Sequence, residues 1–92
     1  MRVTFTISNK PILTLNVDMA TKCVTTEYCD DPRTVDPIIL PEERTYDGLT
    51  RRLKFLMSDK PDDRSLPELL ADLKVNGIAV PWQYNLNVIV SE

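Results

Sequence analysis

The sequence predicts an α+β fold in which one or two helices pack on one face of an antiparallel sheet of about four to five strands. Three observations predict it. Two adjacent N-terminal runs alternate between apolar and polar residues, residues 65–74 begin with a helix-start signal, and residues 84–90 alternate again. Strands that flank helical segments are typical of this two-layer class. A length of 92 residues corresponds to one domain, so we expect a single compact domain over residues 1–92.

The N-terminal residues predict a β-hairpin. Two runs of period two are separated by the turn-forming residues 8–11, which is the usual pattern of two paired strands. Pro11 has no N–H to donate, so it belongs in the turn or at the start of a strand. One face of the hairpin is expected to be buried, and it carries Val3, Phe5, Ile7, Leu13, Leu15 and Val17.

Residues 22–28 are rich in β-forming side chains and predict a third strand with weak alternation. If this segment is one extended strand, Cys23 and Cys29 lie on the same face, about 20 Å apart at the rise of a strand. A disulfide needs Cα atoms within roughly 7 Å of each other. Two thiols in a chain without histidine also cannot complete a structural zinc site. We therefore expect free cysteines unless the segment bends.

Residues 30–41 contain three prolines, Pro32, Pro37 and Pro41. Because proline interrupts both helices and strand ladders, this segment is predicted to be a loop or an extended edge. It includes the short apolar run 38–40, Ile-Ile-Leu. The run is expected to pack against the core, and the alternative is an exposed anchor for a partner.

Residues 45–58 fit two patterns. The Asp47–Gly48 pair is typical of a hairpin turn, and a strand after it places three apolar residues on one face, namely Leu53, Phe55 and Met57. A helix accounts for four apolar positions, namely Leu49, Leu53, Leu56 and Met57. The helix is favoured because it explains more of the apolar residues.

Residues 65–74 carry the clearest signals of a helix. Ser65 and Glu68 form a capping-box pair, and Pro67 falls in the first turn, where its missing N–H is tolerated. An apolar stripe follows at helical spacing, formed by Leu66, Leu69, Leu70 and Leu73. Asn76–Gly77 is expected to end the helix or, alternatively, to form a hairpin turn. A final strand over residues 84–90 is expected to follow.

Composition excludes several classes of function. The chain has no histidine and only two glycines, so neither imidazole chemistry nor a glycine-rich phosphate loop is available. Its net charge of −3 lacks the basic excess of a general nucleic-acid binder. There is no apolar run of the roughly 20 residues that a membrane helix needs, and no secretory signal is visible. We expect a cytoplasmic protein that is not an enzyme and has no cofactor or metal.

The uneven distribution of charge carries most of the functional information. Residues 30–50 contain six acidic and two basic residues, a net charge of −4, whereas residues 51–60 contain four basic residues and one acidic residue, a net charge of +3. Such clusters select partners by complementarity, although a solvated surface gives the same pattern. The candidate partner-binding residues are Asp30, Asp31, Asp36, Glu42, Glu43, Asp47, Arg51, Arg52, Lys54 and Trp82.

Each group of candidates has its own interpretation. The six acidic residues could imitate the row of phosphates in DNA and so occupy a basic nucleic-acid site on another protein, although two arginines interrupt them. The basic residues Arg51, Arg52 and Lys54 suit phosphate contacts, but no aromatic platform is interleaved with them, as single-strand binding normally requires. Trp82 is either a core residue or an interface anchor.

The leading hypothesis is a small, non-enzymatic protein-binding factor, an inhibitor or adaptor that covers a surface of its partner. In size and in its lack of catalytic motifs the chain is similar to small phage-encoded inhibitors of host defence, such as anti-CRISPR or anti-restriction proteins, and such a protein would act in the host cytoplasm. The alternatives are nucleic-acid or ribonucleoprotein contact through Arg51, Arg52 and Lys54, and a structural subunit of a larger assembly. The latter includes a homodimer formed by pairing of edge strands.

Overall fold

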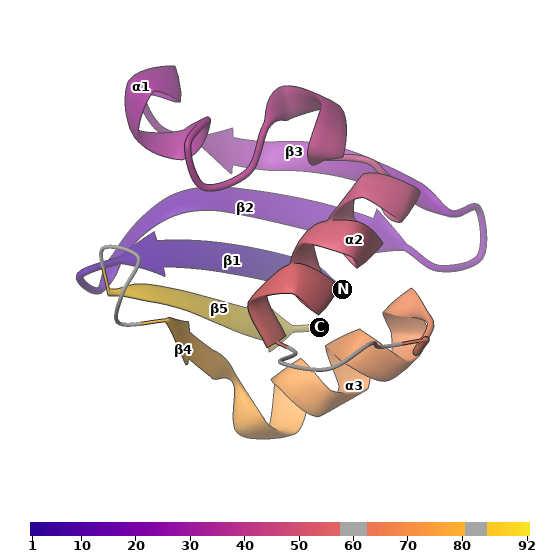
Figure 1. Ribbon diagram of the computed structural model, residues 1–92. Helices are drawn as coiled ribbons and strands as arrows, with labels where there is room; N and C mark the ends of the chain where they lie inside the picture. Colours follow the sequence, from indigo (N-terminus) through magenta and orange to yellow (C-terminus); the bar gives the residue numbers. More distant parts are fainter. Residues whose placement is uncertain (58–62, 81–84) are drawn as a thin grey trace.

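Five strands form one antiparallel sheet in the order β3-β2-β1-β5-β4 in the computed structural model, which describes residues 1–57, 63–80 and 85–92. The strands are β1 (Arg2–Ile7), β2 (Lys10–Asp18), β3 (Cys23–Cys29), β4 (Ile78–Val80) and β5 (Leu86–Ser91). The helical elements are α1 (Pro32–Val35), the 3-10 turn η1 (Pro41–Glu43), α2 (Tyr46–Met57) and α3 (Leu66–Asn76). The predicted α+β class is confirmed, because the helices cover one face of the sheet (Figure 1).

The N-terminal hairpin is confirmed. Val3 pairs with Leu15 and Phe5 with Leu13, and all four are buried. The turn residues 8 and 9 have φ angles of 50° and 68°, the left-handed geometry that matches the twist of paired strands. Of the six residues expected in the core, Ile7 is only half-buried, whereas the other five are buried.

A bulge in β3 corrects the expected placement of the cysteines. Thr14 pairs with Tyr28 but Leu15 pairs with Thr26, so residue 27 is an extra residue. An extra residue reverses the side-chain alternation beyond it. Cys29 therefore pairs with Leu13 on the helix-covered face, whereas Cys23 pairs with Asp18 on the opposite face. The prediction of a shared face was wrong, and both thiols are free and exposed.

The segment predicted to be a loop contains two short helical elements. The Asp31 side chain accepts a hydrogen bond from the Arg33 N–H at 3.0 Å and caps α1. Pro32 occupies the first helical position, where no N–H is needed. The loop prediction overlooked this tolerance of proline at a helix start. Ile38 and Ile39 are buried as expected, whereas Leu40 is exposed.

Residues 46–57 form helix α2, as the spacing of the leucines favours. Leu49, Leu53 and Leu56 are buried against the sheet layer. The Asp47–Gly48 pair is not a turn. A Cβ atom on Gly48 would lie 2.6 Å from the Cα of Glu43, so glycine at this position allows η1 and α2 to approach closely.

Helix α3 has the predicted start and end. The Glu68 carboxylate accepts hydrogen bonds from the Ser65 N–H at 3.1 Å and from the Ser65 hydroxyl at 2.9 Å. Gly77 ends the helix at a φ of 63°, and its N–H donates to the Leu73 carbonyl at 2.8 Å. β4 follows directly and pairs with β5, so the C-terminal strand is confirmed from Leu86 onward.

The core lies between the sheet and the helices, while the other sheet face is uncovered (Figure 1). Alternation along β1 and β5 sends one set of side chains into the core and the other set to the uncovered face. Within the described residues no helix is long and apolar enough to cross a membrane.

Candidate functional site

The structure places the acidic candidates around α1, η1 and the start of α2, and most of them bind a cation of the same chain. Asp47 and Glu42 are exposed and form no ion pair with the described residues. The other four have basic partners: Asp30 with Lys10 at 3.5 Å, Asp31 with Arg33 at 2.9 Å, Asp36 with Arg44 at 2.9 Å and Glu43 with Arg52 at 2.7 Å. The acidic run is therefore largely neutralised within the fold.

Arg44 shows what this pairing does for the structure. Its side chain is only 14 % exposed, and its Nη2 donates to the Asp36 carboxylate at 2.9 Å and to the Ile39 carbonyl at 3.1 Å. Its Nη1 lies 3.8 Å from Cys29 Sγ. Its Nε is buried without a hydrogen-bond partner among the described residues. Arg44 thus connects the chain after α1 to the end of β3.

Glu43 connects η1 to α2. Its Oε1 accepts from the Leu40 N–H at 2.9 Å, and its carboxylate receives two hydrogen bonds from Arg52, at 2.7 and 3.2 Å. The two side chains are 18 % and 19 % exposed. Burial alone raises the pKa of Glu43, but the Arg52 hydrogen bond and charge and the Leu40 N–H together hold this pKa below its ordinary value. Arg52 is therefore a structural cation.

The basic candidates that remain unpaired lie on the α2 outer face, which we define as Arg51, Lys54 and Phe55. Arg51 lies three positions before Lys54 and four before Phe55, so its side chain neighbours both of them on the helix surface. Arg51 and Lys54 form no ion pair with the described part of the chain. The Phe55 side chain is 63 % exposed, and the Arg52 guanidinium lies 5.4 Å from its ring centroid. Two cations without an ion-pair partner among the described residues therefore share this part of α2 with a supported aromatic ring.

Phe55 corrects the statement that no aromatic group accompanies the basic cluster. It does not belong to the buried set of Leu49, Leu53 and Leu56, so the helical spacing already indicated that it faces outward. The alternative strand pattern, which grouped it with Leu53 and Met57, concealed this signal. Trp82, the remaining candidate, lies outside the described residues.

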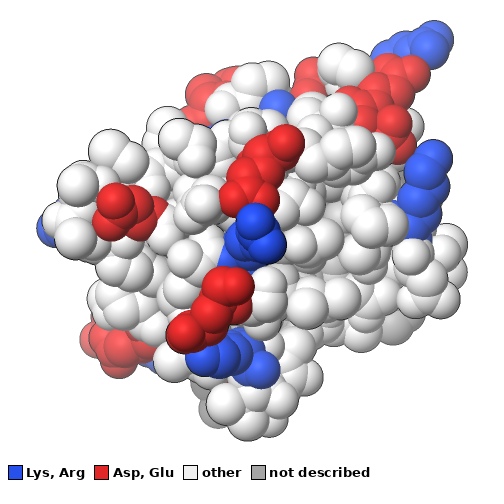
Figure 2. All heavy atoms as spheres, turned by 180° about the vertical axis from the view of Figure 1, so that it is seen from behind, with Lys and Arg blue, Asp and Glu red and all other residues white. Residues whose placement is uncertain are grey.

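The uncovered face of the sheet is a second surface with functional potential. Figure 2 shows this rear side with a column of alternating acidic and basic groups along its middle, an uncharged area beside the column and further charged groups around the edge. Arg2 donates to Glu27 at 2.9 Å, and Asn16 donates to the other oxygen of that carboxylate at 2.9 Å. Strand pairing places neutral residues in the neighbouring cross-strand row, formed by Ile89, Thr4, Thr14 and Tyr28.

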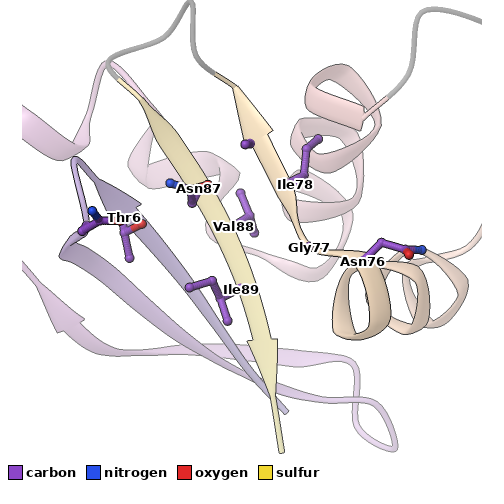
Figure 3. Close-up of a pocket in the computed structure, with 9 residues that line it drawn as sticks. Thr6, Asn76, Gly77, Ile78, Asn87, Val88 and Ile89 are labelled. Atoms are coloured by element: carbon purple, nitrogen blue, oxygen red, sulfur yellow. The ribbon is translucent and has the colours of Figure 1, made fainter.

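A hollow of about 380 Å³ lies at the β4 side of this face (Figure 3). Thr6 of β1, Asn87 and Ile89 of β5, and Asn76 and Gly77 at the junction of α3 with β4 line it. Asn9 of the first turn and residues 78, 79 and 88 complete the wall. None of the described residues that line the hollow is charged, so the chemistry they offer is that of amides, one hydroxyl and aliphatic groups.

The described residues hold no group of three or more side chains suited to a metal ion. Comparisons with protein-family models, with curated proteins and with solved structures found no match. The α2 outer face and the uncovered sheet face are therefore the features from which a function can be inferred.

Proposed function

We propose that the chain is a non-enzymatic, cytoplasmic protein-binding factor, an inhibitor or adaptor, that docks through the α2 outer face onto an acidic surface of another protein. The single observation that carries the proposal is the exposed Phe55 ring, which is stacked against Arg52 and shares the α2 outer face with two cations that have no ion-pair partner among the described residues. Aromatic side chains and arginine are enriched at the centres of protein interfaces.

The charges of this surface define the partner. Arg51 and Lys54 favour carboxylates opposite them, and such pairs steer association and select partners. Phe55 needs an apolar recess between those carboxylates. The Glu43–Arg52 pair holds the guanidinium under the ring before binding occurs, which lowers the ordering cost of association.

Nucleic-acid contact is the alternative, and the structure lowers its support. Arg52 already has its Nε and Nη2 bound to Glu43, which leaves two of the three basic candidates for phosphates. A chain with a net charge of −3 gains little non-specific attraction to phosphate. Phe55 offers one stacking surface, whereas single-strand binding normally uses several.

The test is site-specific photo-crosslinking in lysate of the native host. A photoreactive phenylalanine analogue replaces Phe55 in one variant and Val75, which is 81 % exposed on α3, in the control variant. We expect one protein to cross-link through position 55 but not through position 75, and to do so after nuclease treatment. Capture of nucleic acid instead, or loss of the cross-link on nuclease treatment, would support the alternative.

Affinity for the purified captured protein then tests the residues. Phe55→Ala is expected to weaken binding by about 30-fold, as truncation of an interface anchor does. Arg51→Glu is expected to slow association and to reduce its dependence on salt. If Val75→Ala has the same effect as Phe55→Ala, the α2 outer face is not the interface.

A further inference from the structure

We infer that the hollow on the uncovered sheet face binds a neutral ring compound whose edge carries neighbouring hydrogen-bond donors and acceptors. This chemistry is shared by a nucleobase and a sugar. The hollow lies on the sheet side opposite the helix layer and shares no residue with the α2 outer face, so the inference is independent of the proposed function.

The first argument is the hydrogen-bonding capacity of the wall. Three asparagines line it, Asn9, Asn76 and Asn87, and each carboxamide offers a donor and an acceptor side by side. The Asn76 carboxamide is turned away from Thr6 and Asn87 in Figure 3, and its Nδ2 donates to Asp72 at 2.6 Å, so the amides that remain for a ligand are those of Asn9 and Asn87. The Asn87 Nδ2 has only a long contact of 3.4 Å to the Asn85 carbonyl. Amide groups of this kind recognise the edges of nucleobases and the hydroxyls of sugars.

The hydroxyl of Thr6 is a second hydrogen-bonding group at the hollow. Its side chain is 6 % exposed and lines the hollow, and its hydroxyl forms no hydrogen bond with any described residue. The hydroxyl is not among the fully buried atoms without a partner, so it is reached by solvent and is open to a ligand. Strand pairing places Thr6 beside Asn87, and Asn87 beside Ala79, on the uncovered face. A ligand that reaches Asn87 therefore also reaches the Thr6 hydroxyl.

The third argument concerns charge and size. The lining residues that the structure describes carry no charge, so an ionised ligand group would gain no counter-charge from them and would lose hydration. Ile89, which is 53 % exposed, and Ala79 offer aliphatic surface against the flat side of a ring. A volume of about 380 Å³ falls at the small end of ligand sites, which span roughly 300–1,000 Å³.

The test is a titration of the ¹⁵N-labelled protein followed by NMR chemical shifts. Adenosine and cytidine form one arm, and glucose and N-acetylglucosamine form the other. We expect saturable shifts confined to the lining residues in one arm, which identifies the source of the ring. Adenosine monophosphate is expected to bind no more tightly than adenosine. Tighter binding of the phosphate, or no saturable shift at the lining residues in either arm up to about 10 mM, a limit that corresponds to roughly 3 kcal/mol of binding, would overturn the inference.

Two variants and one control assign the residues. Asn87→Ala removes one amide, and Thr6→Val replaces the hydroxyl with a methyl group of similar size that strands accommodate. Each is expected to weaken binding by about 3- to 10-fold, as the loss of one hydrogen bond does. Asn16→Ala removes an amide from the same sheet face outside the hollow and is expected to leave affinity unchanged. Equal effects of all three would place the ligand elsewhere on the face.

Discussion

The helix layer and the uncovered sheet face differ in the kind of polar side chains they carry and in how these side chains are paired. In the helix layer the charges are dense, but they are bound to one another, as in Glu43–Arg52 and Asp36–Arg44. On the sheet face, an uncharged area lies beside the column of charges, and the Thr4 and Thr14 hydroxyls lie 3.5 Å apart. A charge-rich segment is therefore not by itself a binding surface. The groups left without an internal partner carry the functional information.

Replacement of Gly48 should break the helix layer with the largest effect. In Gly48→Ala the new Cβ would lie 2.6 Å from the Cα and 2.7 Å from the carbonyl oxygen of Glu43, and backbone atoms cannot rotate away. The clash outweighs the gain of about 1 kcal/mol from replacing a helical glycine. We expect a net loss of about 2 to 3 kcal/mol, measured by urea unfolding.

The second glycine is the matched comparison. At Gly77 the nearest atom to a new Cβ is the Val88 carbonyl oxygen at 3.9 Å, but the φ of 63° is unfavourable for alanine. Gly77→Ala should therefore cost about 1 to 2 kcal/mol from backbone strain alone. A smaller loss for Gly48→Ala than for Gly77→Ala would show that η1 and α2 separate easily.

The ion pairs of the two regions should differ in strength. Arg52→Met leaves the largely buried Glu43 carboxylate without its cation, and we expect a loss of about 1 to 2 kcal/mol in the free energy of unfolding. Arg2→Met removes the corresponding cation from Glu27 on the sheet face, where the side chains are 57 % and 30 % exposed. Its cost should be about 0.5 kcal/mol or less. Equal losses in chemical denaturation would remove the energetic distinction between the two regions.

The Glu43–Arg52 pair should also make the free energy of unfolding depend on pH. Because the folded-state pKa of Glu43 lies below its ordinary value of 4.5, the folded state holds this proton less tightly than the unfolded chain. The resulting stability is fully present well above pH 4.5 and is lost as the pH falls through the folded pKa. The pKa values of Asp18, Asp31 and Glu92 are lowered as well, so they add to the decline in the same direction.

Glu43→Gln isolates the contribution of Glu43. The amide oxygen can still accept from the Leu40 N–H, but the side chain no longer titrates. Unfolding curves between pH 7 and about pH 3, which bracket the titration of carboxylates, should show a smaller decline for Glu43→Gln than for the wild type. An unchanged decline would mean that the exposed carboxylates alone account for it.

Local patterns in the sequence predicted most of the fold. Period-two runs identified β1, β2 and β5, and the Ser65–Glu68 and Asn76–Gly77 signals identified both ends of α3. The Asp47–Gly48 pair only left a hairpin alternative open, because the sequence does not show that Gly48 allows η1 and α2 to approach closely. The placement of the two cysteines on one face was wrong, because residue 27 adds a bulge that period two cannot anticipate.

The candidate surfaces were less predictable than the fold. The sequence showed where charges are dense, but which of them are neutralised depends in part on distant partners, such as Arg52 for Glu43 and Lys10 for Asp30. The asparagines of the hollow come from a turn, a helix end and a strand, and no spacing rule joins them. Only the outward placement of Phe55 follows from the helical spacing of the buried leucines in the sequence.

The exposed apolar residues that distinguish the two surfaces should have only a small effect on stability. Phe55→Ala and Ile89→Ala remove side chains that are 63 % and 53 % exposed, so little buried area is lost. Each should change the free energy of unfolding by less than about 1 kcal/mol. Their binding effects should separate completely. Phe55→Ala should weaken binding of the captured partner by about 30-fold and leave the ligand shifts at the hollow intact, whereas Ile89→Ala should weaken binding of the ring ligand and leave the partner bound. If either variant impaired both activities without loss of stability, the two faces would belong to one continuous interface, and the separation between charged and neutral surfaces would have no functional meaning.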